Sequence, residues 1–363
     1  MIAGYDGSSL AQGLSGVGYY TARLLSGLAQ RLGRSGLSEL VVVANGPVPI
    51  PQAPGVRLQP SRHLPVRAAW MELSVPRALR AAGADVAHFT NYTAPLRLDV
   101  PYLVTVHDMS LALLPWCYTW KMRLIVPRVL PRVVRRARLV LAPSAATRDD
   151  VVRLLGIDPG RVRVIPHAAP RGFDPSLAPP DAHEPPYFLF VGNLEPRKNL
   201  ARALRAFARV APSLPDHRFV IAGAPGWKYD DVLREAARPE LARRVELRGY
   251  VPEDELPALY RNAAAFVYPS LYEGFGMPVI EAMACGTPVL ASNVAALPEL
   301  AEGAALLVDP LDEAAIASAM HALGSDAALR RRLREAGPVR AARYSWERTC
   351  DLTLEAYREA AEP

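Results

Sequence analysis

Cysteine is scarce in this chain of 363 residues, which holds Cys117, Cys285 and Cys350 at wide spacings. The three thiols form no CxxC pair and no closely spaced even set. This usage argues against a disulfide framework and against a cysteine-based zinc site. It fits a reducing cytoplasm, which is the compartment that we expect.

Long apolar runs are also missing. No stretch of about 18 uncharged apolar residues occurs, so we expect no membrane-spanning helix. The first ten residues lack a basic region followed by an apolar stretch, so we expect no secretory signal. Aromatic residues make up only 7% of the chain, but half of it is hydrophobic and the apolar residues are spread throughout. This composition excludes a disordered or collagen-like chain and predicts packed cores.

Lysine is scarce as well. Of 42 basic residues only Lys121, Lys198 and Lys228 are lysines, and the formal net charge is +6. The arginine bias, together with many Ala and Pro residues, is typical of a GC-rich genome and carries no functional signal. A lysine at a candidate site is therefore more informative than an arginine.

Short apolar segments alternate with helical patterns, first over residues 1–165 and again after residue 186. The first helical segment is expected at Tyr19–Leu32, and the last at Trp346–Glu362. The expected strands are Ile2–Tyr5, Leu40–Ala44, Val86–Phe89, Leu103–Val106, Leu139–Ala142, Val162–Ile165, Tyr187–Val191, Arg218–Ala222, Val245–Leu247, Ala265–Tyr268, Pro288–Ala291 and Ala305–Val308. Strands separated by helices of ten or more residues predict parallel sheets with crossover helices.

This alternation predicts an α/β protein with two Rossmann-like domains that face each other across a cleft. We expect the first domain at 1–168 and the second at 187–345. The Pro-rich stretch 169–186 reads as the linker between them.

The most informative motif is PSLYEGFGMPVIEAMACGTP, at 269–288. A loop carrying Glu273 follows the strand that ends at Tyr268; Pro278 suits the first position of a helix and Gly286 its end. The loop is thus expected at the carboxyl end of a strand, where helix amides attract phosphate.

Glu281 is expected in the first turn of that helix. Carboxylates beside an anion site are favourable when they accept hydrogen bonds from sugar hydroxyls, which suits both Glu273 and Glu281. The alternative is that Glu281 only complements the helix dipole and that Glu273 is a solvated loop acid.

A second motif, FVGNLEPRKN at 190–199, also runs from a strand end into a helix. Asn199 is expected to cap the helix that begins at Leu200, with Arg197 and Lys198 beside its amide end. Two cations oppose the helix dipole there, and an anion between them would resolve the conflict. The alternative is a pair of exposed basic loop residues.

Two weaker signals lie in the first domain. The glycines of GLSGVG, Gly13 to Gly18, permit a tight turn and the close approach of a ligand to backbone amides. His107 follows the expected strand Leu103–Val106 and would project into the same crevice. The alternatives are a plain strand-to-helix connection and a structural histidine.

All four features fall at the carboxyl ends of expected strands, and together they resemble the retaining nucleotide-sugar glycosyltransferases of group 1, which have the two-domain GT-B arrangement. The resemblance covers nearly the whole chain and is strongest from Tyr187 to Pro310. It implies that Glu273 contacts the transferred sugar, that Glu281 contacts the nucleotide ribose and that Lys198 binds the diphosphate. It also implies that the helix from Trp346 returns to pack on the first domain.

The resemblance gives three catalytic residues, Glu273, His107 and Lys198. It gives the donor-binding set Gly16, Gly18, Asn193, Arg197, Lys198, Gly249, Tyr250, Val251, Glu273, Gly274, Phe275, Gly276 and Glu281. Many relatives carry an arginine where this chain has Asn193. The diphosphate is therefore left to Lys198, with Arg197 in support.

The reaction implied is transfer of a sugar, with retention, from a nucleoside diphosphate to a hydroxyl of a glycan or lipid-linked acceptor. The segments GYDGSS, GVGYYT and VGNLEPRKNL most resemble those of bacterial polysaccharide mannosyltransferases, and this resemblance implies GDP-mannose as the donor. No Asp-x-Asp triplet occurs, so we expect no metal site and no cofactor. The alternatives are a UDP-glucose or UDP-GlcNAc enzyme and a non-catalytic or regulatory nucleotide-sugar-binding protein.

Other classes fit less well. An epimerase or dehydrogenase would need Tyr-x-x-x-Lys, which none of the three lysines provides, and no basic stripe with interleaved aromatics points to nucleic acid.

The segment 111–138 is basic as well as apolar. From Lys121 to Arg138 it holds seven basic residues and no acid. It could bind an anionic membrane or a lipid-linked acceptor, which would place the protein peripherally on the inner membrane face. The alternative is a buried crossover helix with one solvated basic face.

Overall fold

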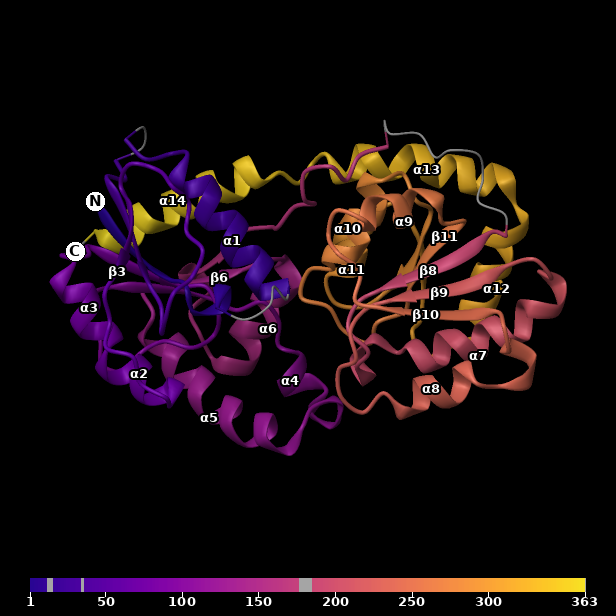
Figure 1. Ribbon diagram of the computed structural model, residues 1–363, viewed down its shortest axis with the longest axis horizontal. Coiled ribbons are helices and arrows are strands. Elements are labelled where there is room, and N and C mark those ends of the chain that lie inside the picture. Colours follow the sequence, from indigo (N-terminus) through magenta and orange to yellow (C-terminus); the bar gives the residue numbers. More distant parts are fainter. Residues whose placement is uncertain (12–15, 34–35, 176–184, 363) are drawn as a thin grey trace. The chain divides into compact units, whose positions relative to one another are not determined.

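The computed structural model describes residues 1–11, 16–33, 36–175 and 185–362. The chain divides into two compact units. The first unit comprises Met1–Ala112, Trp120–His167 and Ser345–Pro363; the second comprises Leu113–Thr119 and Ala168–Tyr344. Each unit has a parallel sheet with helices on both faces, as expected from the sequence (Figure 1).

In the described part of the first unit, the sheet has seven strands in the order β3-β2-β1-β4-β5-β6-β7. The strands are β1 Ile2–Asp6, β2 Glu39–Val43, β3 Val56–Gln59, β4 Val86–Phe89, β5 Tyr102–Thr105, β6 Leu139–Ala142 and β7 Val162–Val164. The helices are α1 Gly16–Ala29, α2 Arg67–Leu73, α3 Val75–Ala81, α4 Ser110–Leu113, α5 Trp120–Arg136, α6 Ala145–Leu155 and α14 Trp346–Ala361. Helices α1 and α14 lie side by side on one face, and α2 and α5 lie on the other (Figure 1).

In the described part of the second unit, the sheet has six strands in the order β10-β9-β8-β11-β12-β13. The strands are β8 Tyr187–Val191, β9 Arg218–Ala222, β10 Val245–Gly249, β11 Ala265–Tyr268, β12 Val289–Ser292 and β13 Leu306–Val308. The helices are α7 Leu200–Val210, α8 Asp230–Ala236, α9 Leu256–Asn262, α10 Met277–Ala284, α11 Leu297–Ala301, α12 Glu313–Ser325 and α13 Ala327–Ala341. The central strands β8 and β11 are wholly buried, as the continuous apolar runs of parallel strands require.

The terminal helix α14 completes the core of the first unit. Cys350, Leu354 and Tyr357 are buried there together with Leu24 and Leu28 of α1. The expected return of this helix to the first domain is confirmed.

One segment differs from the sequence-based division. Residues 113–119, expected within the first domain, pack with the second unit. The reason is a set of bonds from Trp227 and Lys228: the indole Nε1 donates to the Cys117 carbonyl at 2.6 Å, and Lys228 Nζ donates to the Trp116 carbonyl at 2.8 Å.

The first helix begins earlier than expected. Gly16 and Gly18, assigned from the sequence to a loop, lie in the first turn of α1, and Gly18 is buried. Gly13 lies outside the described residues, as does half of the expected linker, 176–184. None of the described helices has the length and apolar character needed to cross a bilayer.

Candidate active site

The motif residues of the second unit meet where β8 and β11 end. Glu273, in the loop after β11, lies between two basic side chains from the loop after β8. Its Oε1 is 2.7 Å from Lys198 Nζ and its Oε2 is 2.9 Å from Arg197 Nη1. Arg197 also contacts Glu195, with 2.7 Å between Nη2 and Oε1. Two cations and two anions from positions up to 78 residues apart thus form one charge-balanced cluster.

This cluster is buried. Glu273 is 7% exposed, Lys198 8% and Glu195 7%. The alternative interpretations of Glu273 and Lys198 as solvated loop charges are therefore wrong. The anion that the sequence called for between Arg197 and Lys198 is supplied by Glu273 itself.

Burial and charge oppose each other in setting the protonation of the cluster. Burial alone would raise the pKa of Glu273, but Arg197 and Lys198 outweigh it and lower that pKa to about 2. Burial, followed by the charge of Arg197, lowers the pKa of Lys198 from its ordinary value. Glu273 is consequently a carboxylate at neutral pH, able to accept hydrogen bonds and unable to act as a general acid.

Asn199 holds the basic loop in place, but not as the helix cap expected from the sequence. Its backbone is left-handed, with φ of 58°, and its side chain makes no capping hydrogen bond. Instead Nδ2 donates to the carbonyls of Pro269 (2.9 Å) and Pro310 (2.8 Å). Asn199 therefore ties the loop after β8 to the start of the Glu273 loop.

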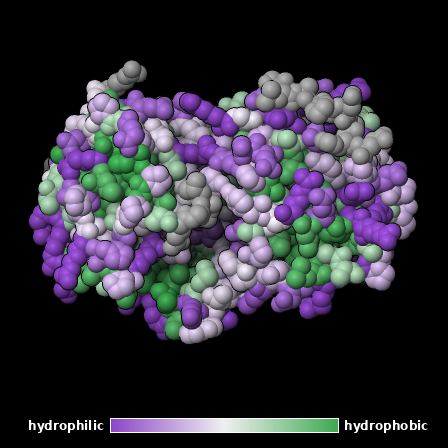
Figure 2. Space-filling view, in the orientation of Figure 1, coloured by the Kyte–Doolittle hydropathy of each residue, from purple (hydrophilic) through white to green (hydrophobic). Residues whose placement is uncertain are grey.

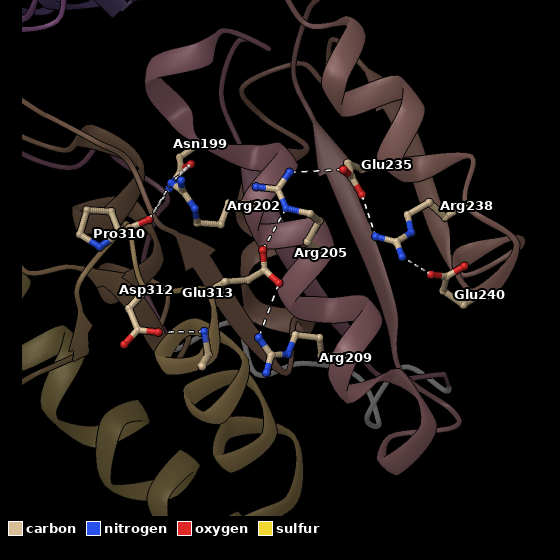
Figure 3. A network of polar contacts seen from close by, with 11 residues as sticks. Asn199, Arg202, Arg205, Arg209, Glu235, Arg238, Glu240, Pro310, Asp312 and Glu313 are labelled. Atoms are coloured by element: carbon tan, nitrogen blue, oxygen red, sulfur yellow. Dashed lines mark hydrogen bonds and ion pairs between the residues drawn. The ribbon is translucent and has the colours of Figure 1, made fainter.

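Helix α7, which follows this loop, is anchored further along by ion pairs. Arg205 contacts Glu313 of α12 at 2.9 Å and Glu235 of α8 at 3.3 Å, and Arg202 shares the Pro310 carbonyl with Asn199 (Figure 3). Ion pairs thus connect α7 to both α8 and α12, and they anchor the helix that follows the Lys198 loop.

Gly276 shapes the entry into α10. Its φ is 104°, a left-handed conformation that side chains rarely adopt, and an added Cβ would lie 2.7 Å from a Leu297 methyl carbon. Only glycine fits, and the turn starts α10 directly after Gly274 and Phe275, both of which are buried.

Glu281 lies in the second turn of α10, not in the first turn as expected, because the helix begins at Met277. Its Oε2 accepts a 2.9 Å hydrogen bond from the hydroxyl of Tyr260 in α9. This position weakens the helix-dipole interpretation, since dipole interactions fall off within the first turn.

The residues expected to bind the base lie at the ends of neighbouring strands. Gly249 ends β10, and its carbonyl accepts a 2.7 Å hydrogen bond from the amide of Gly223. Tyr250 is 64% exposed, and Val251 is half-buried. Asn193 is exposed after the end of β8.

In the first unit, His107 follows β5 as expected. Its Nε2 lies 2.8 Å from the carbonyl of Thr90, which can only accept, so Nε2 carries the proton. Burial lowers the pKa of His107, so the ring is neutral and Nδ1 has a free lone pair. Tyr20 of α1 packs edge-on against the ring, with 4.8 Å between centroids.

The described residues contain no group of three or more His, Cys, Asp or Glu side chains arranged to hold a metal ion. Three contact residues were not predicted from the sequence: Tyr268 and Glu195 beside the charged cluster of the second unit, and Thr90 beside His107 in the first. Tyr268 closes β11, and its position at a carboxyl strand end was the one signal that could have found it.

Comparisons with known proteins identify the family of this chain. Residues 178–340 match the family described as Glycosyl transferases group 1, and residues 14–171 match Glycosyltransferase Family 4. The chain is 30% identical to O-antigen chain mannosyltransferase B of Escherichia coli over 304 residues, which cover 81% of this chain and 77% of that protein. The chain belongs to the group 1 glycosyltransferases, and it is an enzyme of that family.

The chain is also similar to a longer protein and to two solved structures. The chain is 29% identical to the serotype-specific mannosyltransferase WbdA of Escherichia coli over 61% of its own length but only 29% of that protein. Its fold matches sucrose-phosphate synthase from Thermosynechococcus elongatus, with a TM-score of 0.78, 22% identity and 98% of both chains covered. It also matches WaaG, a glycosyltransferase involved in lipopolysaccharide biosynthesis, with a TM-score of 0.76, 16% identity and 98% and 99% covered. The fold is therefore GT-B.

Proposed function

We propose that this glycosyltransferase moves mannose from GDP-mannose to a hydroxyl of a glycan or lipid-linked acceptor, with retention at the anomeric carbon. The similarity to O-antigen chain mannosyltransferase B supports mannose as the sugar. The observation that carries the proposal is the buried cluster in which Glu273 is held ionised between Arg197 and Lys198. It offers an acceptor for sugar hydroxyls beside two cations for a diphosphate.

In the proposed step, the acceptor oxygen forms a bond to the anomeric carbon while the bond from that carbon to the β-phosphate oxygen breaks. The electron pair of the broken bond stays on the phosphate, and the acceptor proton moves to that leaving oxygen. Lys198, Arg197 and the amide end of α10 stabilise the negative charge that grows there. This electrostatic role needs no divalent ion, so we propose a metal-independent reaction.

The two motif glutamates take different parts in this proposal. Glu273 accepts hydrogen bonds from hydroxyls of the transferred sugar, and Glu281 accepts them from the nucleotide ribose. His107, neutral and with Nδ1 unprotonated, accepts a hydrogen bond from a hydroxyl of the donor sugar at Nδ1. None of these residues is assigned as a covalent nucleophile.

A thermal unfolding screen tests the donor. GDP-mannose, UDP-glucose and UDP-GlcNAc are each added in excess, with GDP and UDP alone as controls. A ligand at 100 times its dissociation constant stabilises the fold by about 2.7 kcal/mol, so the true donor gives a clear increase in melting temperature. We expect the largest increase with GDP-mannose; a larger one with UDP-glucose would overturn this choice. UDP-glucose is the relevant competitor because Alr3699/HepE of Anabaena, which shares the fold, was solved with it.

Turnover tests the acceptor and the stereochemistry. Octyl α-mannoside serves as a defined lipid-like acceptor, and GDP release and the anomeric configuration of the product are measured by NMR. We expect an α-linked product from the α-linked donor. Binding of GDP-mannose without GDP release would exclude octyl α-mannoside as an acceptor, and a β-linked product would exclude retention.

We also propose that the start of α5 contacts an anionic membrane surface. Trp120 is 68% exposed, Leu124 48% and Ile125 57%, whereas Val133 and Val134, at the other end of the helix, are buried. The surface over α5 accordingly mixes hydrophobic and hydrophilic residues (Figure 2). Apolar side chains within a helix that is basic and free of acids suit the interface of an anionic bilayer.

Vesicle flotation tests this contact. Binding should require phosphatidylglycerol in phosphatidylcholine vesicles, weaken with salt and decrease in the double variant Trp120→Ala/Ile125→Ala. The matched control is Val339→Ala, which removes a 69% exposed apolar residue from α13. Equal flotation of the double variant and wild type would exclude α5 as the contact.

A further inference from the structure

Tyr268 lies at the centre of the second sheet and is held rigidly. It is the last residue of β11, which pairs with β8 and β12, and it is fully buried. Its ring stacks on Phe190 of β8 with 5.9 Å between centroids, and on Phe266 of its own strand with 5.4 Å. A row of three stacked rings leaves the phenol one orientation.

The hydroxyl of Tyr268 contacts Lys198, the cation of the Lys198–Glu273 pair. Its oxygen accepts a 2.5 Å hydrogen bond from Lys198 Nζ, which also lies 4.9 Å from the centre of the ring. Burial, followed by the charge of Glu273, keeps the pKa of Tyr268 well above its ordinary value, so the phenol stays protonated and neutral beside the ion pair.

These contacts determine where the ammonium group of Lys198 points. An ammonium has three N–H donors in tetrahedral directions. Within the described part of the chain, two of them are directed to Tyr268 Oη and Glu273 Oε1. Once two directions are fixed the third is fixed too, and it is left for an oxygen of the ligand.

We propose that Tyr268 is a positioning residue, which directs the third N–H of Lys198 at the donor diphosphate. This inference rests on the proposed function, because it takes the donor diphosphate to be the ligand of Lys198. Tyr268 itself is assigned no contact with the donor. Without the hydroxyl, Nζ keeps one anchored donor and can turn about it. The positive charge of Lys198 remains, but the direction of its third N–H is no longer fixed.

Kinetics of Tyr268→Phe test the role. This variant keeps the ring, its stacking and its cation–π contact, and loses only the hydroxyl. With GDP-mannose and octyl α-mannoside, we expect kcat to fall about tenfold while KM for the donor stays within about twofold, since misplacing a group that acts in the transition state costs rate more than affinity.

The matched control is Tyr187→Phe. Tyr187 begins β8, and its buried hydroxyl donates a 2.8 Å hydrogen bond to the Leu259 carbonyl. This variant also loses a phenolic hydrogen bond, but at the amino end of a strand, away from the strand ends that carry the site. Its melting temperature should fall by about as much as that of Tyr268→Phe, while its kcat stays that of wild type.

A second measurement reads the position of Lys198 without any donor. Because the chain has three lysines, lysine labelled with ¹³C at Cε gives three NMR signals, and Lys121 and Lys228 serve as internal references. In wild type the Lys198 signal should titrate below an ordinary lysine. In Tyr268→Phe it should titrate about one pH unit lower still, because the charged form loses an acceptor.

The two measurements separate the two proposals. If wild type does not turn over GDP-mannose, the donor assignment fails and the lysine titration alone decides the role of Tyr268. An unchanged Lys198 titration in Tyr268→Phe overturns that role whatever the rate does. A shifted titration with wild-type kcat also overturns it, because aiming Lys198 would then be irrelevant to the reaction.

Discussion

Lys198 and Glu273, which lie 75 residues apart in sequence, form a buried ion pair with 2.7 Å between Nζ and Oε1. Each side chain thereby determines the charge and orientation of the other. Changing either one alters a pair, and Arg197 is the nearest group able to compensate. The predictions for these two residues depend on that coupling.

Glu273→Gln should lower kcat about a hundredfold, since losing a contact that strengthens in the transition state costs on the order of 3 kcal/mol. It should leave the affinity for GDP equal or greater, because Arg197 and Lys198 are then balanced by Glu195 alone and attract the diphosphate more strongly. Steady-state kinetics and GDP calorimetry measure the two effects. Wild-type turnover would contradict the role of Glu273.

Lys198→Ala should cost roughly 2–4 kcal/mol of transition-state stabilisation, because a charge-assisted contact is lost in a site shielded from water. The further change Arg197→Ala should nearly abolish activity in a folded protein. Lys121→Ala, which removes an exposed lysine, is the control in an assay without membranes. Comparable rates for wild type and Lys198→Ala would show that Lys198 does not bind the diphosphate.

Glu281→Ala should weaken donor binding about tenfold or more, as expected for a lost hydrogen bond to a carboxylate. Tyr260→Phe is the informative partner variant, because it removes the 2.9 Å hydrogen bond to Glu281 but keeps the carboxylate. Its affinity for GDP-mannose should stay within about threefold of wild type. An unchanged dissociation constant in Glu281→Ala would restore the helix-dipole interpretation.

Activity should survive excess EDTA, because Lys198 and Arg197 supply the positive charge that a divalent ion supplies in other transferases. GDP release from GDP-mannose is followed with EDTA alone and with added Mg²⁺ or Mn²⁺. Loss of activity in EDTA that either ion restores would refute the metal-independent reaction.

Stability should fall in acid because of His88, which bonds to the Tyr357 hydroxyl and to Thr105, both at 2.8 Å. Burial lowers its pKa from 6.5 to about 3. The unfolded chain thus takes up a proton below pH 6.5 that the folded chain refuses until about pH 3. This residue should remove about 1.4 kcal/mol of unfolding free energy per pH unit in that window.

Urea unfolding between pH 7.5 and 4.5 measures this effect. The plot of unfolding free energy against pH should be less steep in His88→Gln, by the equivalent of about one proton. The control is His321→Gln, a histidine change at an exposed position of α12. Equal slopes for wild type and His88→Gln would show that His88 does not resist protonation in the fold.

The sequence was most informative where strands are buried on both faces. β4, β6, β8, β9 and β11 have the expected bounds, because continuous apolar runs between helices identify central parallel strands. β3, Val56–Gln59, was missed: as an edge strand it carries Arg57 and Gln59 and is partly exposed, so it lacks that signature.

The site was less predictable than the strands. The motifs placed Glu273, Arg197 and Lys198 at strand ends, but no local pattern could show that one carboxylate lies between both cations. Asn199 and Glu281 were also misplaced: the backbone at Asn199 is left-handed, and the helix that carries Glu281 begins one position before Pro278. These details depend on tertiary contacts that sequence spacing does not encode.

The return of α14 to the first unit sets an order for folding during synthesis. The core of the first unit stays incomplete until Cys350, Leu354 and Tyr357 have left the ribosome, although its strands emerge first. The second unit comprises the continuous segment Ala168–Tyr344 and the short segment Leu113–Thr119, which precedes it in the chain. All of its strands and helices have therefore been synthesised before α14. The half of the chain made first is therefore the half that finishes folding last, which reverses the usual N-terminal-first order.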